Sequence, residues 1–99
     1  MLDLATVRCE QFTACLNQDF EIVAAAGPVT LQLSEARLTG THHVADTREP
    51  FSLVFRGPAE LRLPQGIYPI KHAQLGEMEI FLVQIAADKT SSSFEAVFN

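Results

Sequence analysis

The sequence has no tryptophan, one tyrosine, and only five glycines and five prolines among its 99 residues. Collagen-like and low-complexity chains need far more glycine and proline, so both classes are excluded. The hydrophobic fraction of 47% is too high for a disordered chain. A chain of this length forms one domain with one modest core, so we treat residues 1–99 as a single domain.

Basic residues are also scarce. Seven lysines and arginines stand against twelve acidic residues, which gives a formal net charge of −5, and no two of the bases are adjacent. Nucleic-acid binding depends on Lys and Arg that neutralise phosphates, and anionic membranes attract clusters of the same residues. We therefore expect neither a nucleic acid nor a membrane as partner.

Long apolar runs are missing. The longest, at residues 23–27 and 80–83, fall well short of the roughly 18 residues that a membrane helix requires. The first six residues contain neither the basic nor the apolar region of a signal peptide. We expect a cytoplasmic protein.

The motifs of common catalytic and cofactor sites are absent as well. The two cysteines, Cys9 and Cys15, lack the Cys-x-x-Cys spacing of redox and zinc sites, and we interpret them as small apolar side chains. The glycines are dispersed, with no phosphate-binding motif, and no Gly-x-Ser-x-Gly nucleophile motif occurs. We predict no cofactor, no metal and no catalytic residue.

What the sequence does contain is one helical pattern followed by strand patterns. Cys9, Phe12 and Leu16 are spaced as on one helix face, which predicts a helix over residues 6–17. Thr6 is the expected N-cap, and Asn17 closes the helix because asparagine tolerates left-handed geometry. Alternating apolar residues predict six strands, at 19–25, 29–38, 51–56, 67–72, 77–86 and 94–98.

Strands at this spacing, joined by short turns, are typical of an antiparallel meander. The sequence therefore predicts a mainly β fold, a small antiparallel barrel or sandwich of about six strands with one short N-terminal helix. The helix would plug one end or cover an edge. Strand parity alone does not separate the barrel from the sandwich, because both satisfy the same alternation.

Several apolar residues lie on the wrong parity for the inner face of a single sheet. An exposed apolar patch of this kind usually marks an interface, and arginine is frequent at binding hot spots. The first hypothesis is thus a non-enzymatic protein-interaction or assembly module, binding another protein or a second copy as a homodimer. The predicted interface residues are Val54, Arg56, Phe81, Val83, Ile85 and Val97.

The alternative hypothesis is a small enzyme or a ligand or metal binder that uses the loop at residues 39–49. This connection is long and polar, and such loops in small domains are often functional. Its candidate residues are His42, His43, Asp46 and Glu49, with His72 as a further member. Adjacent histidines on an extended chain point in opposite directions, so the spacing does not favour a metal site over two solvent-exposed side chains.

Four segments carry a family resemblance, at residues 49–58 (EPFSLVFRGP), 63–68 (LPQGIY), 75–83 (LGEMEIFLV) and 94–99 (FEAVFN). Together they resemble an uncharacterised bacterial family of proteins of about this length, a domain of unknown function. Asn17 stands where the family has glycine, and Gln84 where it has proline. The resemblance implies a bacterial source, an intracellular β-rich domain without assigned catalysis, and a link to phage-tail-like structures.

Overall fold

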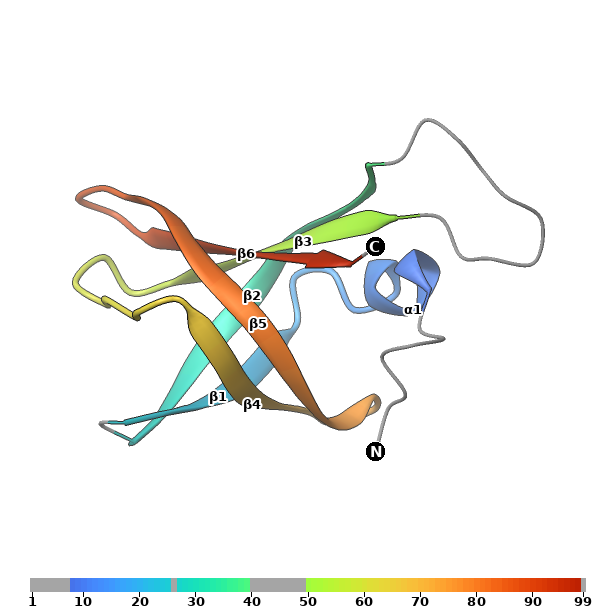
Figure 1. Cartoon of the computed structure of the whole chain (residues 1–99), viewed down its shortest axis with the longest axis horizontal. Coiled ribbons are helices and arrows are strands. Elements are labelled where there is room, and N and C mark those ends of the chain that lie inside the picture. The colour runs from blue at the N-terminus through green and yellow to red at the C-terminus, as the bar shows by residue number, and fades with distance from the viewer. Residues whose placement is uncertain (1–7, 26, 40–49, 99) are drawn as a thin grey trace.

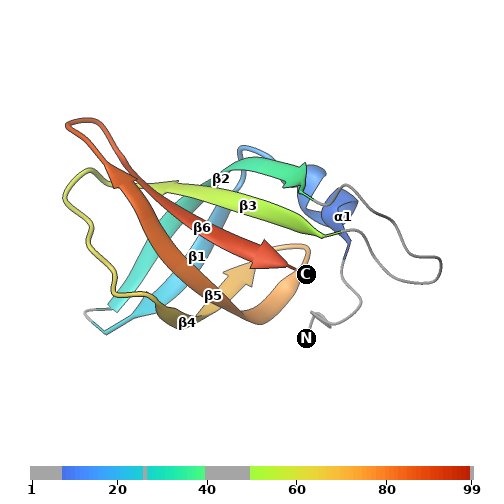
Figure 2. The same cartoon turned by 45° about the horizontal axis from the view of Figure 1, so that its top comes forward.

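The protein forms a closed antiparallel β-barrel with a short helix at one end (Figures 1 and 2). This computed structural model describes residues 8–25, 27–39 and 50–98. The elements are α1 (Cys9–Thr13), β1 (Asp19–Ala24), β2 (Gly27–Leu38), β3 (Phe51–Gly57), β4 (Gly66–His72), β5 (Gly76–Ala87) and β6 (Ser92–Phe98).

The strands follow the order β1-β2-β3-β6-β5-β4 around the barrel. The barrel is closed where β1 meets β4, through the pairs Glu21–Lys71 and Ile22–Ile70. The predicted barrel is therefore confirmed over the sandwich. The predicted meander is wrong at one connection, because β6 lies between β3 and β5 and the chain passes from β3 to β4 without pairing those strands (Figure 1). Alternation within a strand carries no information on which strands are neighbours.

The inward-facing side chains fill the barrel with a phenylalanine-rich core. Phe20 of β1 packs edge-on against Phe55 of β3, with ring centroids 5.2 Å apart. At one end Phe12 of α1 contacts Phe51 and Phe98, at centroid distances of 5.9 and 5.8 Å. Fully burying one such side chain contributes about 1.5–3 kcal/mol, so docking Phe12 on the barrel stabilises a helix far too short to form alone.

The helix is shorter than the sequence predicts. It covers Cys9–Thr13 instead of 6–17, and the predicted N-cap, Thr6, lies outside the described residues. The backbone N–H of Arg8 donates to Gln11 Oε1 at 2.8 Å at the helix start. Asn17 has a φ of 67°, so it takes the predicted left-handed conformation, but in the turn that follows the helix.

Both cysteines are free thiols buried in the core. Burial raises the pKa of the Cys15 thiol. A raised pKa keeps the side chain protonated and unreactive near neutral pH, because the thiolate is the nucleophile. This agrees with the interpretation of the cysteines as apolar packing residues.

Two β-bulges shape the barrel. The register shifts between Leu33 and Glu35 in β2 and between Gln84 and Ala86 in β5. A bulge bends its strand and increases the local twist, which helps a small sheet to close. Ile85 is the extra residue of the β5 bulge, whereas Phe81 and Val83 precede the bulge and lie on the outer face of the strand.

The Gly-Pro pair at residues 27 and 28, a sequence typical of turns, belongs to a strand. Gly27 and Pro28 begin β2 and pair with Ala24 and Val23, because the hairpin loop is only two residues long. Gly27 has a φ of 126°, which glycine adopts without strain. In the connection between β3 and β4, the backbone N–H of Leu61 donates to the Pro58 carbonyl at 3.1 Å and closes a turn.

Candidate functional site

Two large apolar side chains face each other on the outside of the barrel. Ile67 of β4 and Phe81 of β5 are direct cross-strand partners, and 65% and 50% of their surfaces are exposed. Their neighbours Tyr68 and Ile80 form the next pair and point the other way, as alternation requires. Directly opposed residues have Cβ atoms about 4.5–5.5 Å apart, so Ile67 and Phe81 present one continuous apolar surface.

The apolar surface continues toward β6. Val83 on β5 pairs with Glu95 on β6, and Phe81 and Val97 are both displaced from that pair in the same direction. Val97 is 57% exposed and Val83 is half-buried. We call Ile67, Phe81, Val83 and Val97 the outer apolar patch. Because β4, β5 and β6 are neighbours in the barrel, the patch lies on a rigid, hydrogen-bonded surface.

Carboxylates border this patch. Glu79 precedes Phe81 by two residues on the same face of β5, and Glu95 precedes Val97 in the same way on β6. Two residues of a strand advance about 6.6–6.8 Å, which places each carboxylate beside an exposed apolar side chain. Neither glutamate forms an ion pair with any residue that the structure describes.

The one lysine of these three strands is already engaged. Lys71 lies between Glu21 of β1 and Glu77 of β5, and its Nζ is 3.9 Å from Glu77 Oε1. Such an exposed pair contributes at most about 1 kcal/mol. Because Lys71 is paired with Glu77, the surface around the patch keeps an excess of negative charge from Glu79 and Glu95.

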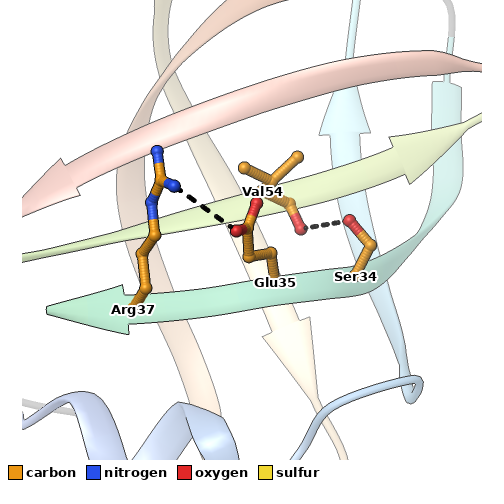
Figure 3. Close-up of polar contacts among 4 residues, drawn as sticks. All are labelled: Ser34, Glu35, Arg37 and Val54. Atoms are coloured by element: carbon orange, nitrogen blue, oxygen red, sulfur yellow. Dashed lines mark hydrogen bonds and ion pairs between the residues drawn. The ribbon is translucent and has the colours of Figure 1, made fainter.

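The neighbouring outer face, over β2 and β3, is polar (Figure 3). The Ser34 hydroxyl donates to the Val54 carbonyl at 3.0 Å, and Arg37 Nη1 lies 3.6 Å from Glu35 Oε1. The polar groups of the bulged strand β2 are therefore engaged in a hydrogen bond and an ion pair. Exposed apolar side chains elsewhere, such as Val23 of β1 and Leu38 at the end of β2, stand apart from the outer apolar patch.

Of the predicted interface residues, Arg56, Phe81, Ile85 and Val97 are exposed, whereas Val54 and Val83 are half-buried. Arg56 lies apart from the patch, paired with Gln32 and Ser93. The sequence prediction missed Ile67. The parity of Ile67 is opposite to that of the inward-facing Tyr68 and Ile70, and this parity could have indicated that Ile67 points outward. Its position opposite Phe81 follows only from the strand register.

The other candidate site cannot be assembled from the described residues. The loop residues His42, His43, Asp46 and Glu49 all lie outside them. Among the residues 8–25, 27–39 and 50–98, no group of three or more His, Cys, Asp or Glu side chains could hold a metal ion. The one described member of that site is His72.

His72 has a structural role. It is buried at the end of β4 and stacks on Phe20 with ring centroids 4.5 Å apart. Its Nδ1 accepts hydrogen bonds from the backbone N–H groups of Gln74 and Leu75, both at 3.1 Å. An accepting Nδ1 requires the proton on Nε2, which therefore donates to Gln18 Oε1 at 2.7 Å. Neither ring nitrogen is available to a ligand.

Within the described part of the chain, no helix is long and apolar enough to cross a membrane. Comparison with curated proteins and with solved structures found no match. One family model does match, described as Domain of unknown function (DUF6916), and it covers residues 7–98. Because that match spans nearly the whole chain, the protein belongs to this family.

Proposed function

We propose that this protein is a non-enzymatic protein-interaction module that docks a partner on the outer apolar patch. The observation that carries the proposal is the exposed pair Ile67 and Phe81, directly opposed across β4 and β5. Contiguous exposed apolar surface on a small domain usually marks a binding site. Aromatic side chains, phenylalanine included, are also enriched in the buried centres of protein interfaces.

The energetic argument follows from surface burial. Removing apolar surface from water is worth about 25 cal/mol per Å², and side chains that project from paired strands lose little conformational freedom on binding. The patch therefore offers binding energy without a large ordering cost. The proposal covers a second copy of the chain or a different protein as partner, and a phage-tail-like assembly as its setting.

The test compares proteins captured from the source cell by three tagged forms of the chain. The forms are wild type, Phe81→Glu in the patch, and Leu38→Glu, a control that is 53% exposed at the end of β2. We expect wild type and Leu38→Glu to retain the same partner, and Phe81→Glu to lose it. Thermal unfolding of all three forms shows that each is folded.

The result that contradicts the proposal is equal capture by wild type and Phe81→Glu, or no specific partner for either. Sedimentation velocity at micromolar concentration covers the case of a second copy as partner. A wild-type dimer that Phe81→Glu converts to monomer would support the proposal with the chain itself as the partner.

A further inference from the structure

This inference rests on the proposed function and narrows its partner. We propose that the outer apolar patch binds a different polypeptide, in which apolar side chains are bordered by Lys or Arg, in preference to a second copy of this chain. The proposal is carried by the charges around the patch, and these are set by Glu79 and Glu95.

The two glutamates are placed to meet such a partner. Each is two residues from an exposed apolar side chain on its own strand face, Glu79 from Phe81 and Glu95 from Val97. Neither has a cationic partner in the described part of the molecule. Lys71 is the one base on β4, β5 and β6, and it lies beside Glu77.

A partner that covers the patch removes water from these carboxylates. Desolvating an unpaired carboxylate opposes binding, whereas a guanidinium or ammonium group on the partner compensates through charge-assisted hydrogen bonds. The spacing suits an extended segment, in which residues two apart share a face at the same separation of about 6.6–6.8 Å. The partner motif is thus an apolar residue with Lys or Arg two positions away.

The same charges argue against a second copy. A two-fold dimer places the same surface of both protomers face to face. Glu77, Glu79 and Glu95 of both protomers would then be brought to one interface, where Lys71 and Arg56, which pairs with Ser93 two residues from Glu95, offset them only in part. Like charges brought together across an interface disfavour association. Apolar burial and electrostatic attraction therefore both favour binding when the partner carries Lys or Arg beside its apolar side chains.

The test uses random peptides displayed on phage and selected on the immobilised full-length protein. Each pool is depleted on Phe81→Glu, so that only ligands of the patch are kept. We expect the enriched peptides to combine apolar residues with Lys or Arg. The most enriched peptide is then synthesised, and its affinity is measured with wild type, with the double variant Glu79→Gln/Glu95→Gln, and with Lys71→Gln.

We expect the double variant to weaken peptide binding by about fivefold or more, since two exposed ion pairs are lost. Added salt should weaken binding to wild type in the same direction. Lys71→Gln is the matched control, because it removes the competing base, and it should leave the affinity unchanged or raise it. Unfolding temperatures of the variants show that the barrel is retained.

Three results of the peptide experiment would overturn this inference. They are failure to enrich any peptide, enrichment without Lys or Arg, and an affinity that the double variant does not change. A wild-type dimer that dissociates in Phe81→Glu would also overturn it, because the patch then binds a second copy. In each case capture of a partner from the source cell still decides the proposed function separately.

Discussion

The side-chain amide of Gln84 on β5 forms two hydrogen bonds with the backbone of Leu61 and Leu63, one as acceptor and one as donor, as the backbone of a neighbouring strand would. Gln84 Oε1 accepts from Leu63 N at 3.2 Å, and Gln84 Nε2 donates to the Leu61 carbonyl at 3.1 Å. This happens at the β5 bulge, beside a connection that has no strand pairing of its own. The two hydrogen bonds hold the β3–β4 connection in a position from which Leu63 packs into the core.

Replacing Gln84 with alanine should lower the free energy of unfolding by about 1–3 kcal/mol, because a partly buried donor and acceptor lose their partners. The matched control is Gln32→Ala. Its amide donates to the Asn17 carbonyl at 3.1 Å in an exposed position, where water replaces the bond, so a change below about 0.5 kcal/mol is expected. Urea denaturation measures both. Equal losses would show that Gln84 does not act through these two bonds.

Gln84 also illustrates what the sequence alone reveals. The alternating apolar residues at 77–86 predicted the strand that carries Gln84. The partners of Gln84 could not be predicted, because they lie on a loop whose position depends on the barrel's strand order. Period-2 alternation identifies strands and their inner faces, but it does not specify which strands pair.

The same limit applies to the outer patch. Parity alone indicated that Phe81 and Val97 point outward, as the structure has them. Val54 and Val83 share that parity but are half-buried. Glu95 of β6 lies between them, because it pairs with Val54 of β3 on one side and with Val83 of β5 on the other. Ile67 was missed because its significance comes from its register partner. Exposure on a closed barrel therefore depends on cross-strand neighbours that only the topology defines.

The buried His72 should make stability depend on pH. Burial lowers its pKa from the ordinary value of 6.5, and a proton on Nδ1 would face the N–H groups of Gln74 and Leu75. The unfolded chain then binds the proton more readily than the folded chain. The stabilising effect is complete above pH 6.5 and is lost as the pH falls below it, by at most about 1.4 kcal/mol per pH unit.

Urea denaturation between pH 7.5 and 5 measures this loss. In the control variant His72→Asn, the asparagine Oδ1 can still accept from the turn but does not titrate, so we expect lower stability at pH 7 and a shallower pH dependence. An NMR titration of the wild-type ring should give a pKa below 6.5. Identical slopes for both proteins would show that His72 does not carry the effect.

Two buried serines should respond oppositely to alanine. The Ser52 hydroxyl is buried with no hydrogen-bond partner among the described residues, so Ser52→Ala should leave stability unchanged or raise it. The Ser92 hydroxyl is also buried and donates to the Pro58 carbonyl at 2.7 Å. Ser92→Ala should cost about 1–2 kcal/mol, because that acceptor is left unsatisfied. Denaturation midpoints that shift equally would refute this distinction.

Gly57 is required where β3 leaves the barrel wall. A Cβ atom there would lie 2.5 Å from Leu31 Cδ2 and 3.2 Å from Leu61 Cδ2, and Leu31 is fully buried, so the leucines must move within a packed core. Gly57→Ala should therefore lower the free energy of unfolding by about 1–3 kcal/mol.

Gly66 at the start of β4 is the matched control. A Cβ there meets nothing within 4 Å, and Gly66 is not among the glycines with positive φ. Gly66→Ala should be neutral or stabilising by up to about 1 kcal/mol, because alanine restricts the unfolded chain. Thermal and urea unfolding distinguish the two variants. Similar stability of Gly57→Ala and Gly66→Ala would mean that the core around Leu31 accommodates a methyl group, contrary to the close packing described here.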